Sequence, residues 1–324
     1  MSEGAKLPAE FSLIARHFRP LAGEGALGLS DDAALLDPPA GQQLVLAADA
    51  MVAGVHFLPD DPPETIGRKL MRVNLSDLAA MGAKPLAYLM TVALPPGTDT
   101  AWLDAFTAGM AEDQARFGLS VLGGDTVSTP GPLTLSLTII GTVPPGKALL
   151  RRGARVGDEL WVSGSIGDGA LGLRAARGAL PDDGYLAGRY RLPEPRVDLG
   201  IALRGVARAA MDVSDGLAQD CGHLCRLAGC SAEIAVQDVP LSPAARAALE
   251  ADPALLPLIL SGGDDYELLF AAAPGDAARV VEAGLAARTP VTRIGLFTEG
   301  PADVTLRDAK GGVFSLPRGG WSHF

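Results

Sequence analysis

Carboxylates placed beside apolar residues are the first chemical feature of this sequence. The stretch MDVSDGLAQD, residues 211–220, holds Asp212, Asp215 and Asp220 directly after the apolar run GVARAA. An unpaired charge among buried residues costs several kcal/mol or more, so these aspartates need partners that offset the burial. A divalent cation is one such partner, because hard ions such as Mg²⁺ prefer carboxylate oxygens.

The same arrangement recurs along the chain, where aspartates follow apolar runs or glycine pairs. The recurrences are Asp31 and Asp32 in GLSDDAALL, Asp49 in LVLAADAMV, Asp125 in VLGGDTVS, and Asp264 and Asp265 in ILSGGDDYELLF. Asp beside Gly is a common turn device, which is the simpler interpretation of any single case. Their repetition favours a magnesium site. Because Mg²⁺ fills its octahedron with water and phosphate oxygens, the pattern also predicts a polyphosphate ligand, which backbone N–H groups at the glycines can approach.

Asp77 belongs to the same set for a different reason. In the segment 63–83, Leu70, Asn74, Asp77 and Met81 fall on one stripe of a helix. Leu and Met indicate that this stripe faces inward, which puts a carboxylate where an unpaired charge is costly. A buried salt bridge or a cap to a neighbouring loop is the alternative explanation of Asp77 taken alone.

Other common sites are weakly supported. The triphosphate loop G-x-x-x-x-G-K-[ST] is missing, and the two G-x-G-x-x-G matches, residues 23–28 and 167–172, lack the strand context or the later acidic residue of a dinucleotide site. Cys221, His223, Cys225 and Cys230 lie close together in sequence, but a second pair of zinc ligands is missing and buried thiols on a helix explain the cluster equally well.

Composition narrows the class of protein. The chain has 324 residues, 48% of them hydrophobic, which is enough for two domains with their own cores. We expect neither a membrane span nor a secretion signal, because no apolar run is long enough and the N-terminus lacks an apolar core. Three cysteines favour a reducing cytoplasm, and a net charge of −11 argues against nucleic acid and anionic membranes as partners.

Strands alternating with helices must position these side chains. In the N-terminal half the periodicity predicts helices over 7–18, 63–83 and 98–118, and strands around 44–48 and over 85–95, 119–125 and 133–143. In the other half it predicts strands over 159–164, 210–213, 232–237 and 266–273, and helices over 169–180, 194–210, 216–229 and 276–287. A break in periodicity over 143–158 predicts a domain boundary, giving domains 1–148 and 149–324. The order indicates an α+β fold.

The motifs taken together resemble the thiamine-monophosphate kinase family. The resemblance covers the chain in order and rests on DDAAL at 31–35, VAGVHF at 52–57, NLSDLAAMGA at 74–83, GGDT at 123–126, DVSDGL at 212–217, SGGDDYEL at 261–268 and the ending GWSHF. DVSDGL and GGDT are shared with aminoimidazole ribonucleotide synthetases and selenophosphate synthetases. NLSDLAAMGA and SGGDDYEL together are the specific signal.

The resemblance implies phosphorylation of thiamine monophosphate by ATP with several Mg²⁺ ions. It implies an aminoimidazole ribonucleotide synthetase-like fold, with an N-terminal mixed sheet that pairs across a homodimer and a C-terminal α/β domain. By motif it implies metal ligands Asp31, Asp49, Asp77, Asp125, Asp212 and Asp215, ATP contacts at Gly124, Asp125, Arg151 and Ser214, and substrate contacts at His56, Asp264 and Trp321. No general base is expected, since the attacking phosphate oxygen is ionised at neutral pH.

Three departures from the family pattern concern details of this site. Ala47-Ala48-Asp49-Ala50 stands where the family usually carries hydroxyl residues around the aspartate, Ser30 replaces a frequent glycine, and Asp264 replaces a glutamate. Two alternatives stay open: another ATP-dependent synthetase of the same superfamily, and a non-catalytic sensor of magnesium and nucleotide. A selenophosphate synthetase usually has a Cys or selenocysteine near its N-terminus, and here the first cysteine is Cys221.

Overall fold

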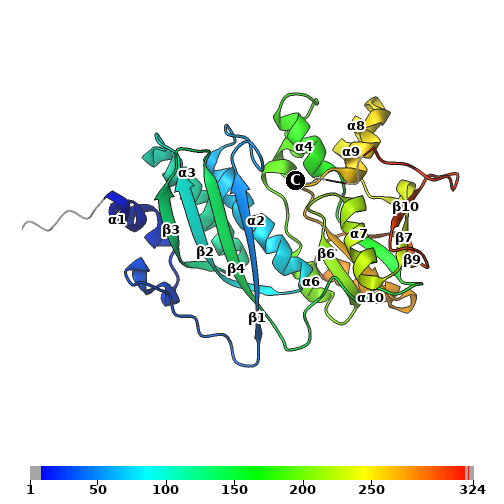
Figure 1. Cartoon of the computed structure of the whole chain (residues 1–324), viewed down its shortest axis with the longest axis horizontal. Coiled ribbons are helices and arrows are strands. Elements are labelled where there is room, and N and C mark those ends of the chain that lie inside the picture. The colour runs from blue at the N-terminus through cyan, green and yellow to red at the C-terminus, as the bar shows by residue number, and fades with distance from the viewer. Residues whose placement is uncertain (1–8, 318–319, 321–324) are drawn as a thin grey trace, which may run out of the picture. The chain divides into compact units, whose positions relative to one another are not determined.

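Two compact units make up the chain in the computed structural model, which describes residues 9–317 and 320. The first unit comprises the residues up to Leu75 together with Pro85–Thr142, and the second comprises Ser76–Lys84 and the residues from Val143 onward. The long helix α2 therefore begins in the first unit and ends in the second. Each unit contains one β-sheet with helices packed on it (Figure 1), which confirms the predicted α+β class.

The first unit is built on a four-stranded sheet in the order β1-β4-β2-β3, with β2 and β3 parallel. Its elements are α1 (Ala9–Leu13), which continues as a π-helix over Ile14–Phe18, β1 (Gln43–Val52), α2 (Pro63–Ala80), β2 (Lys84–Leu94), α3 (Thr100–Phe117), β3 (Ser120–Ser128) and β4 (Thr134–Val143). The predicted helices over 63–83 and 98–118 are confirmed. Asp99 caps α3 by accepting a bond from the Trp102 N–H, and Gly118 ends it in the left-handed conformation.

Close packing of α2 against α3 depends on small residues. A Cβ at Gly109 of α3 would lie 2.2 Å from the carbonyl oxygen of Glu64 on α2. Only glycine permits that approach, because any side chain at this position would collide with the backbone of α2. Leu70, Met71 and Phe106 then form part of a fully buried core beneath the sheet.

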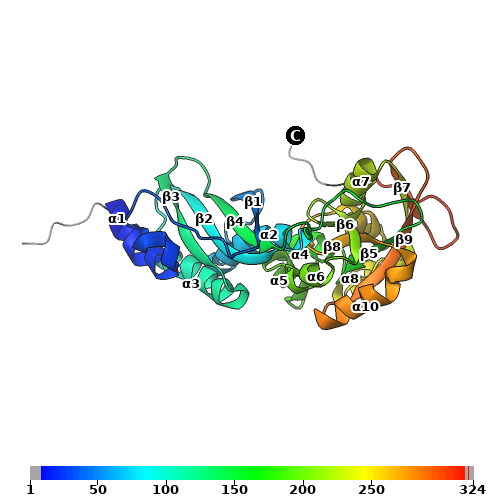
Figure 2. The same cartoon turned by 90° about the horizontal axis from the view of Figure 1, so that it is seen from below.

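The second unit is built on a six-stranded mixed sheet in the order β10-β7-β9-β5-β8-β6. Its strands are β5 (Glu159–Ser163), β6 (Ala207–Asp212), β7 (Ser231–Ala235), β8 (Leu268–Ala272), β9 (Val291–Thr298) and β10 (Val304–Arg307), and its helices are α4 (Asp168–Ala176), α5 (Tyr185–Arg191), α6 (Val197–Ala202), α7 (Leu217–Ala228), α8 (Pro243–Ala251), α9 (Leu256–Ser261) and α10 (Ala277–Ala286). Figure 2 shows helices on both sides of this sheet, with α7 and α10 on opposite sides.

One predicted element is wrong in its second half. The helix expected over 194–210 is limited to α6, and Ala207–Asp212 forms β6 instead. This strand is antiparallel to β8, with Met211 paired to Leu269 and Asp212 to Leu268. The segment GVARAA has a helical composition, but burial of Ala209, Ala210 and Met211 in the sheet outweighs local propensity.

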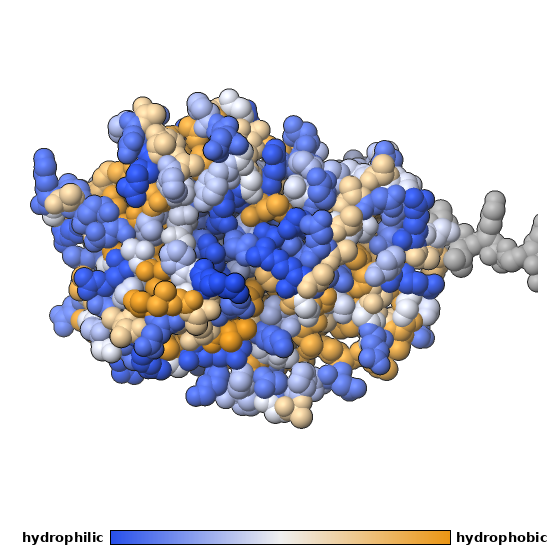
Figure 3. Space-filling model, turned by 180° about the vertical axis from the view of Figure 1, so that it is seen from behind, coloured by the Kyte–Doolittle hydropathy of each residue, from blue (hydrophilic) through white to orange (hydrophobic). Residues whose placement is uncertain are grey.

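Among the described residues, no helix combines the length and the apolar composition that crossing a bilayer requires. Hydrophilic residues spread over much of the face shown in Figure 3, with smaller hydrophobic patches among them.

Candidate active site

Asn74 of α2 fixes the position of Asp49 in the first unit. The Asn74 side chain is fully buried, and its Oδ1 accepts a hydrogen bond of 3.0 Å from the Asp49 N–H. Its Nδ2 donates to the Leu70 carbonyl at 2.9 Å, which decides which end of the amide faces β1. The sequence places Asn74 on the inward stripe of the helix and assigns it no role. In the structure, Asn74 holds the strand that carries Asp49.

A cavity of about 750 Å³ in the first unit brings together Asp31 and Asp125. Asp32, Gly123 and Gly124 also line it, and Asp49 is not among its lining residues. Gly124 cannot be replaced without moving the sheet, because a Cβ there would lie 1.7 Å from the Met90 carbonyl oxygen on β2. Gly124, directly before Asp125, therefore lets β3 run close to β2 while the Asp125 carboxylate lies at the cavity.

His56 lies in a short loop after β1, in the same unit. The Val52 N–H donates to the Nδ1 of its ring at 3.0 Å, and Lys69 of α2 donates from Nζ to its carbonyl oxygen at 3.0 Å. The contact between Lys69 and His56 could not be predicted from the sequence, because no local pattern links a histidine to a lysine thirteen positions away.

Three of the predicted aspartates, Asp77, Asp212 and Asp215, belong to the second unit. Asp212 ends β6 and is 4% exposed, and its Oδ2 accepts a hydrogen bond of 2.8 Å from the Ser76 hydroxyl. Asp77 follows Ser76 on α2 and is half-buried, although every other residue from Met71 to Ala80 is buried. Asp212 is therefore buried as the sequence predicts, whereas Asp77 is only half-buried and its carboxylate loses less hydration.

The turn after Asp212 is held by a carboxylate that the sequence prediction left without a role. Asp220 of α7 accepts bonds of 3.0, 3.0 and 3.1 Å from the N–H groups of Ser214, Asp215 and Gly216. Burial, together with the charge of Asp212, raises the pKa of Asp220 to about 7, against the N–H donors that favour its ionised form. Asp220 therefore shapes the turn that presents Ser214 and Asp215.

Asp215, Asp220 and His223 approach one another closely. One potential ligand atom from each lies within 4.8 Å of the other two. The Asp215 carboxylate also accepts a bond of 3.1 Å from the Gln219 side chain. Burial and the neighbouring charges of Arg226 and Arg151 lower the pKa of His223. Arg151 itself lies in an exposed loop before β5.

The loop 261–267 is joined to this turn by backbone hydrogen bonds. The Asp264 N–H donates to the Ser214 carbonyl at 3.0 Å, the Tyr266 N–H to the Val213 carbonyl at 2.8 Å, and the Val213 N–H to the Glu267 carbonyl at 2.8 Å. Asp264 and Tyr266 adopt φ of 71° and 52°, in the left-handed region that most residues avoid. Two motifs that are far apart in sequence, DVSDG and SGGDDYE, therefore form one surface that carries Ser214, Asp215 and Asp264.

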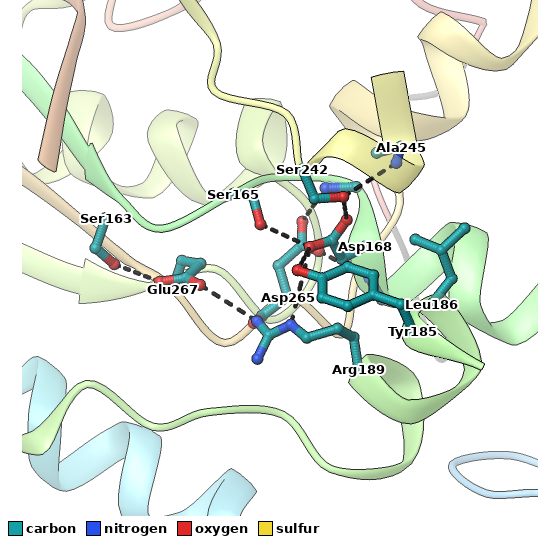
Figure 4. Close-up of polar contacts among 12 residues, drawn as sticks. Ser163, Ser165, Asp168, Tyr185, Leu186, Arg189, Ser242, Ala245, Asp265 and Glu267 are labelled. Atoms are coloured by element: carbon teal, nitrogen blue, oxygen red, sulfur yellow. Dashed lines mark hydrogen bonds and ion pairs between the residues drawn. The ribbon is translucent and has the colours of Figure 1, made fainter. Parts of the chain in front are cut away.

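Two buried carboxylates in the loop between α9 and β8, Glu267 and Asp265, hold this loop through polar contacts (Figure 4). The fully buried Glu267 accepts bonds from Arg196 Nε at 2.6 Å, Arg189 Nη2 at 3.2 Å and the Ser163 hydroxyl at 2.6 Å. The fully buried Asp265 accepts from the N–H groups of Gly167 and Gly169 at 2.8 and 2.9 Å. Burial raises the pKa of Asp265 well above its ordinary value. These hydrogen bonds and ion pairs hold the loop that carries Asp265 and Glu267 in place.

The donor chemistry of the candidate residues fits Mg²⁺. All six predicted ligands offer carboxylate oxygens, which are the hard donors that magnesium prefers, and none offers sulfur. Asp31, Asp49 and Asp125 belong to the first unit and Asp77, Asp212 and Asp215 to the second. The three cysteines are free and buried, as expected for structural thiols. The predicted contact residue Trp321 lies outside the described residues.

Comparison with known proteins decides the family. The profile of AIR synthase related protein, N-terminal domain, matches residues 30–143, and that of the C-terminal domain matches residues 155–307. The chain is 48% identical over 322 residues to the thiamine-monophosphate kinase of Caulobacter vibrioides, covering 98% of this chain and 91% of the relative. The chain belongs to the thiamine-monophosphate kinase family.

Solved structures of the thiamine-monophosphate kinase family share this fold over most or all of the chain. The crystal structure of thiamine-monophosphate kinase from Stenotrophomonas maltophilia K279a superposes with a TM-score of 0.82 at 41% identity, covering 92% of this chain and 96% of that one. A structure described as AaThiL complexed with AMPPCP and TMP superposes with a TM-score of 0.78 at 29% identity, covering 100% of both chains. The predicted resemblance and the two-domain fold are confirmed.

Proposed function

We propose that this enzyme transfers the γ-phosphoryl group of ATP to thiamine monophosphate and forms thiamine diphosphate. The observation that carries the proposal is the match over 100% of both chains to a structure described as holding AMPPCP and TMP. Identity of 48% to a thiamine-monophosphate kinase supports the same reaction. The alternatives within the superfamily, a synthetase or a nucleotide sensor, lack comparable support.

The chemistry requires little from the protein besides positioning. The acceptor is a phosphate oxygen that is already ionised at neutral pH, so no side chain has to remove a proton. The main obstacle is bringing two anions into line, and holding them in that geometry supplies much of the rate. Mg²⁺ held by the proposed aspartates would supply positive charge that screens the phosphates from one another and stabilises the transfer.

The residues fall into three groups by the ligand that each group would bind. Asp31, Asp49, Asp77, Asp125, Asp212 and Asp215 would hold Mg²⁺. Gly124 and Ser214 would contact ATP together with Asp125 and Arg151, and His56, Asp264 and Trp321 would contact thiamine monophosphate. Two features support these roles: the Gly124 backbone at a cavity of about 750 Å³, and the proximity of Ser214, Asp215 and Asp264 on joined loops.

A homodimer is part of the proposal. Leu46 on β1, Leu89 on β2 and Val127 on β3 are 62%, 40% and 43% exposed, so the four-stranded sheet offers apolar side chains to a second copy of the chain. A cytoplasmic location is also proposed, supported by three free buried thiols.

One assay separates the proposed reaction from the alternatives. The protein is incubated with ATP, Mg²⁺ and thiamine monophosphate, and thiamine diphosphate is measured by chromatography. The proposal expects its formation with equal release of ADP. Consumption of ATP without thiamine diphosphate would favour another synthetase, and binding of ATP without turnover would favour a sensor.

A further inference from the structure

Lys69 is a buried lysine whose charge has a defined use in the first unit. Its side chain is 2% exposed, and its Nζ donates to the His56 carbonyl oxygen at 3.0 Å. Lysine is almost never fully buried without partners, since taking an ammonium group out of water is costly. The ammonium group of Lys69 is therefore used inside the protein, where it binds the backbone of the loop that carries His56.

The loop around His56 is closed by its own hydrogen bonds. The N–H groups of Val55 and His56 both donate to the Val52 carbonyl at 3.0 Å, and the Gly54 N–H donates to the Phe57 carbonyl at 2.8 Å. Lys69 connects α2 to this loop by its hydrogen bond to the His56 carbonyl oxygen. The position of the imidazole therefore depends on a residue thirteen positions away on a rigid helix.

The contact with Val52 also fixes the state of the imidazole. Because the Val52 N–H donates to Nδ1 at 3.0 Å, this nitrogen acts as an acceptor and carries no proton. The proton of the neutral ring is then on Nε2, so any hydrogen bond made through Nε2 is one that His56 donates. A donor on a half-buried side chain is suited to an oxygen of a phosphate ester.

We propose that Lys69 is a positioning residue for the phosphorylated acceptor substrate, acting through the backbone of His56. The inference rests on the proposed function, in which His56 contacts thiamine monophosphate. Lys69 holds the carbonyl of His56 and thereby sets where the Nε2–H donor stands. Loss of Lys69 moves this donor while leaving Gly124 and Asp125, the proposed ATP contacts of the same unit, in place. The effect is therefore selective for one of the two substrates.

Steady-state kinetics of Lys69→Met tests the inference, with KM measured separately for thiamine monophosphate and for ATP. The expected result is a rise of about tenfold in KM for thiamine monophosphate, as for one lost hydrogen bond, with KM for ATP unchanged within about twofold. Lys69→Arg, which keeps a cationic donor, should recover part of the affinity. Lys84→Met, at an exposed position at the start of β2, is the matched control and should match wild type.

His56→Gln separates this inference from the proposed function. The inference expects His56→Gln to raise KM for thiamine monophosphate, and the double variant with Lys69→Met to add little more. If Lys69→Met leaves both KM values unchanged and lowers only the melting temperature, Lys69 is structural and the inference is wrong. It is also wrong if His56→Gln has no effect, although formation of thiamine diphosphate by wild type would still support the proposed function. If Lys69→Met does not fold, Lys69→Gln takes its place with the same expected split.

Discussion

Ser76 donates a hydrogen bond of 2.8 Å to the Asp212 carboxylate, although 136 positions separate the two residues in the chain. Both side chains are buried, at 0% and 4% exposure. A hydroxyl that donates to a metal-binding carboxylate orients it, and such outer contacts influence metal affinity strongly. Given the metal role proposed for Asp212, the serine in NLSDL would be a functional part of the motif, like the aspartate that follows it.

Ser76→Ala should raise the concentration of Mg²⁺ needed for half-maximal activity by about tenfold, because Asp212 loses the donor that orients it. The measurement is activity against free Mg²⁺ at saturating substrates. Ser128→Ala, at an exposed position on β3, is the control and should not change the curve. An unchanged Mg²⁺ requirement in Ser76→Ala would show that the Ser76 hydrogen bond does not contribute to metal binding.

Asp77→Asn should abolish activity with little loss of folding. The amide has nearly the shape of the carboxylate, and Asp77 is half-buried, so packing in α2 is preserved. Loss of a metal ligand removes several kcal/mol of charge stabilisation, which is a rate loss of about a hundredfold or more. Turnover and melting temperature are measured on the same sample. Near-normal turnover would contradict the metal assignment.

Glu267→Gln should destabilise the second unit severely. The substitution leaves Arg189 and Arg196 without the buried carboxylate that they share, and breaking such a pair costs about 3–5 kcal/mol. The melting temperature should fall by about 10 °C. Asp276→Asn removes a half-buried partner of the exposed Arg279 and should cost less than about 1 kcal/mol. Similar melting temperatures for the two variants would show that the Glu267 cluster is not needed for stability.

Asp265→Asn should change how stability depends on pH. Burial raises the pKa of Asp265 above its value in the unfolded chain, so folding takes up a proton between the two values. The stability that Asp265 contributes is thus largest at low pH and declines as pH rises through the folded pKa. The difference in unfolding free energy between wild type and Asp265→Asn, from urea titrations at several pH values, should shrink as pH rises from about 4 to 8. A difference that stays constant or grows would mean that Asp265 is ionised in the folded protein throughout.

The sequence by itself determined most of the elements and supplied the candidate acidic residues. Helices such as α2 and α3 follow from apolar periodicity and from local signals at their ends, which act between residues a few positions apart. The motifs around Asp77, Asp125 and Asp215 are likewise contiguous stretches, so they could be recognised without knowing the fold. The chemistry of their side chains pointed to Mg²⁺ and phosphate for the same local reason.

Only the tertiary structure decided how these stretches are held. The pairing of β6 with β8 turned a helical composition into a strand, because burial in the sheet is worth more than propensity. The joining of the Ser214 turn to the Asp264 loop, the tie from Lys69 to His56 and the bond from Ser76 to Asp212 each link residues far apart in the chain. Such contacts depend on how whole elements pack, and a local sequence pattern carries no information about which distant group will stand opposite.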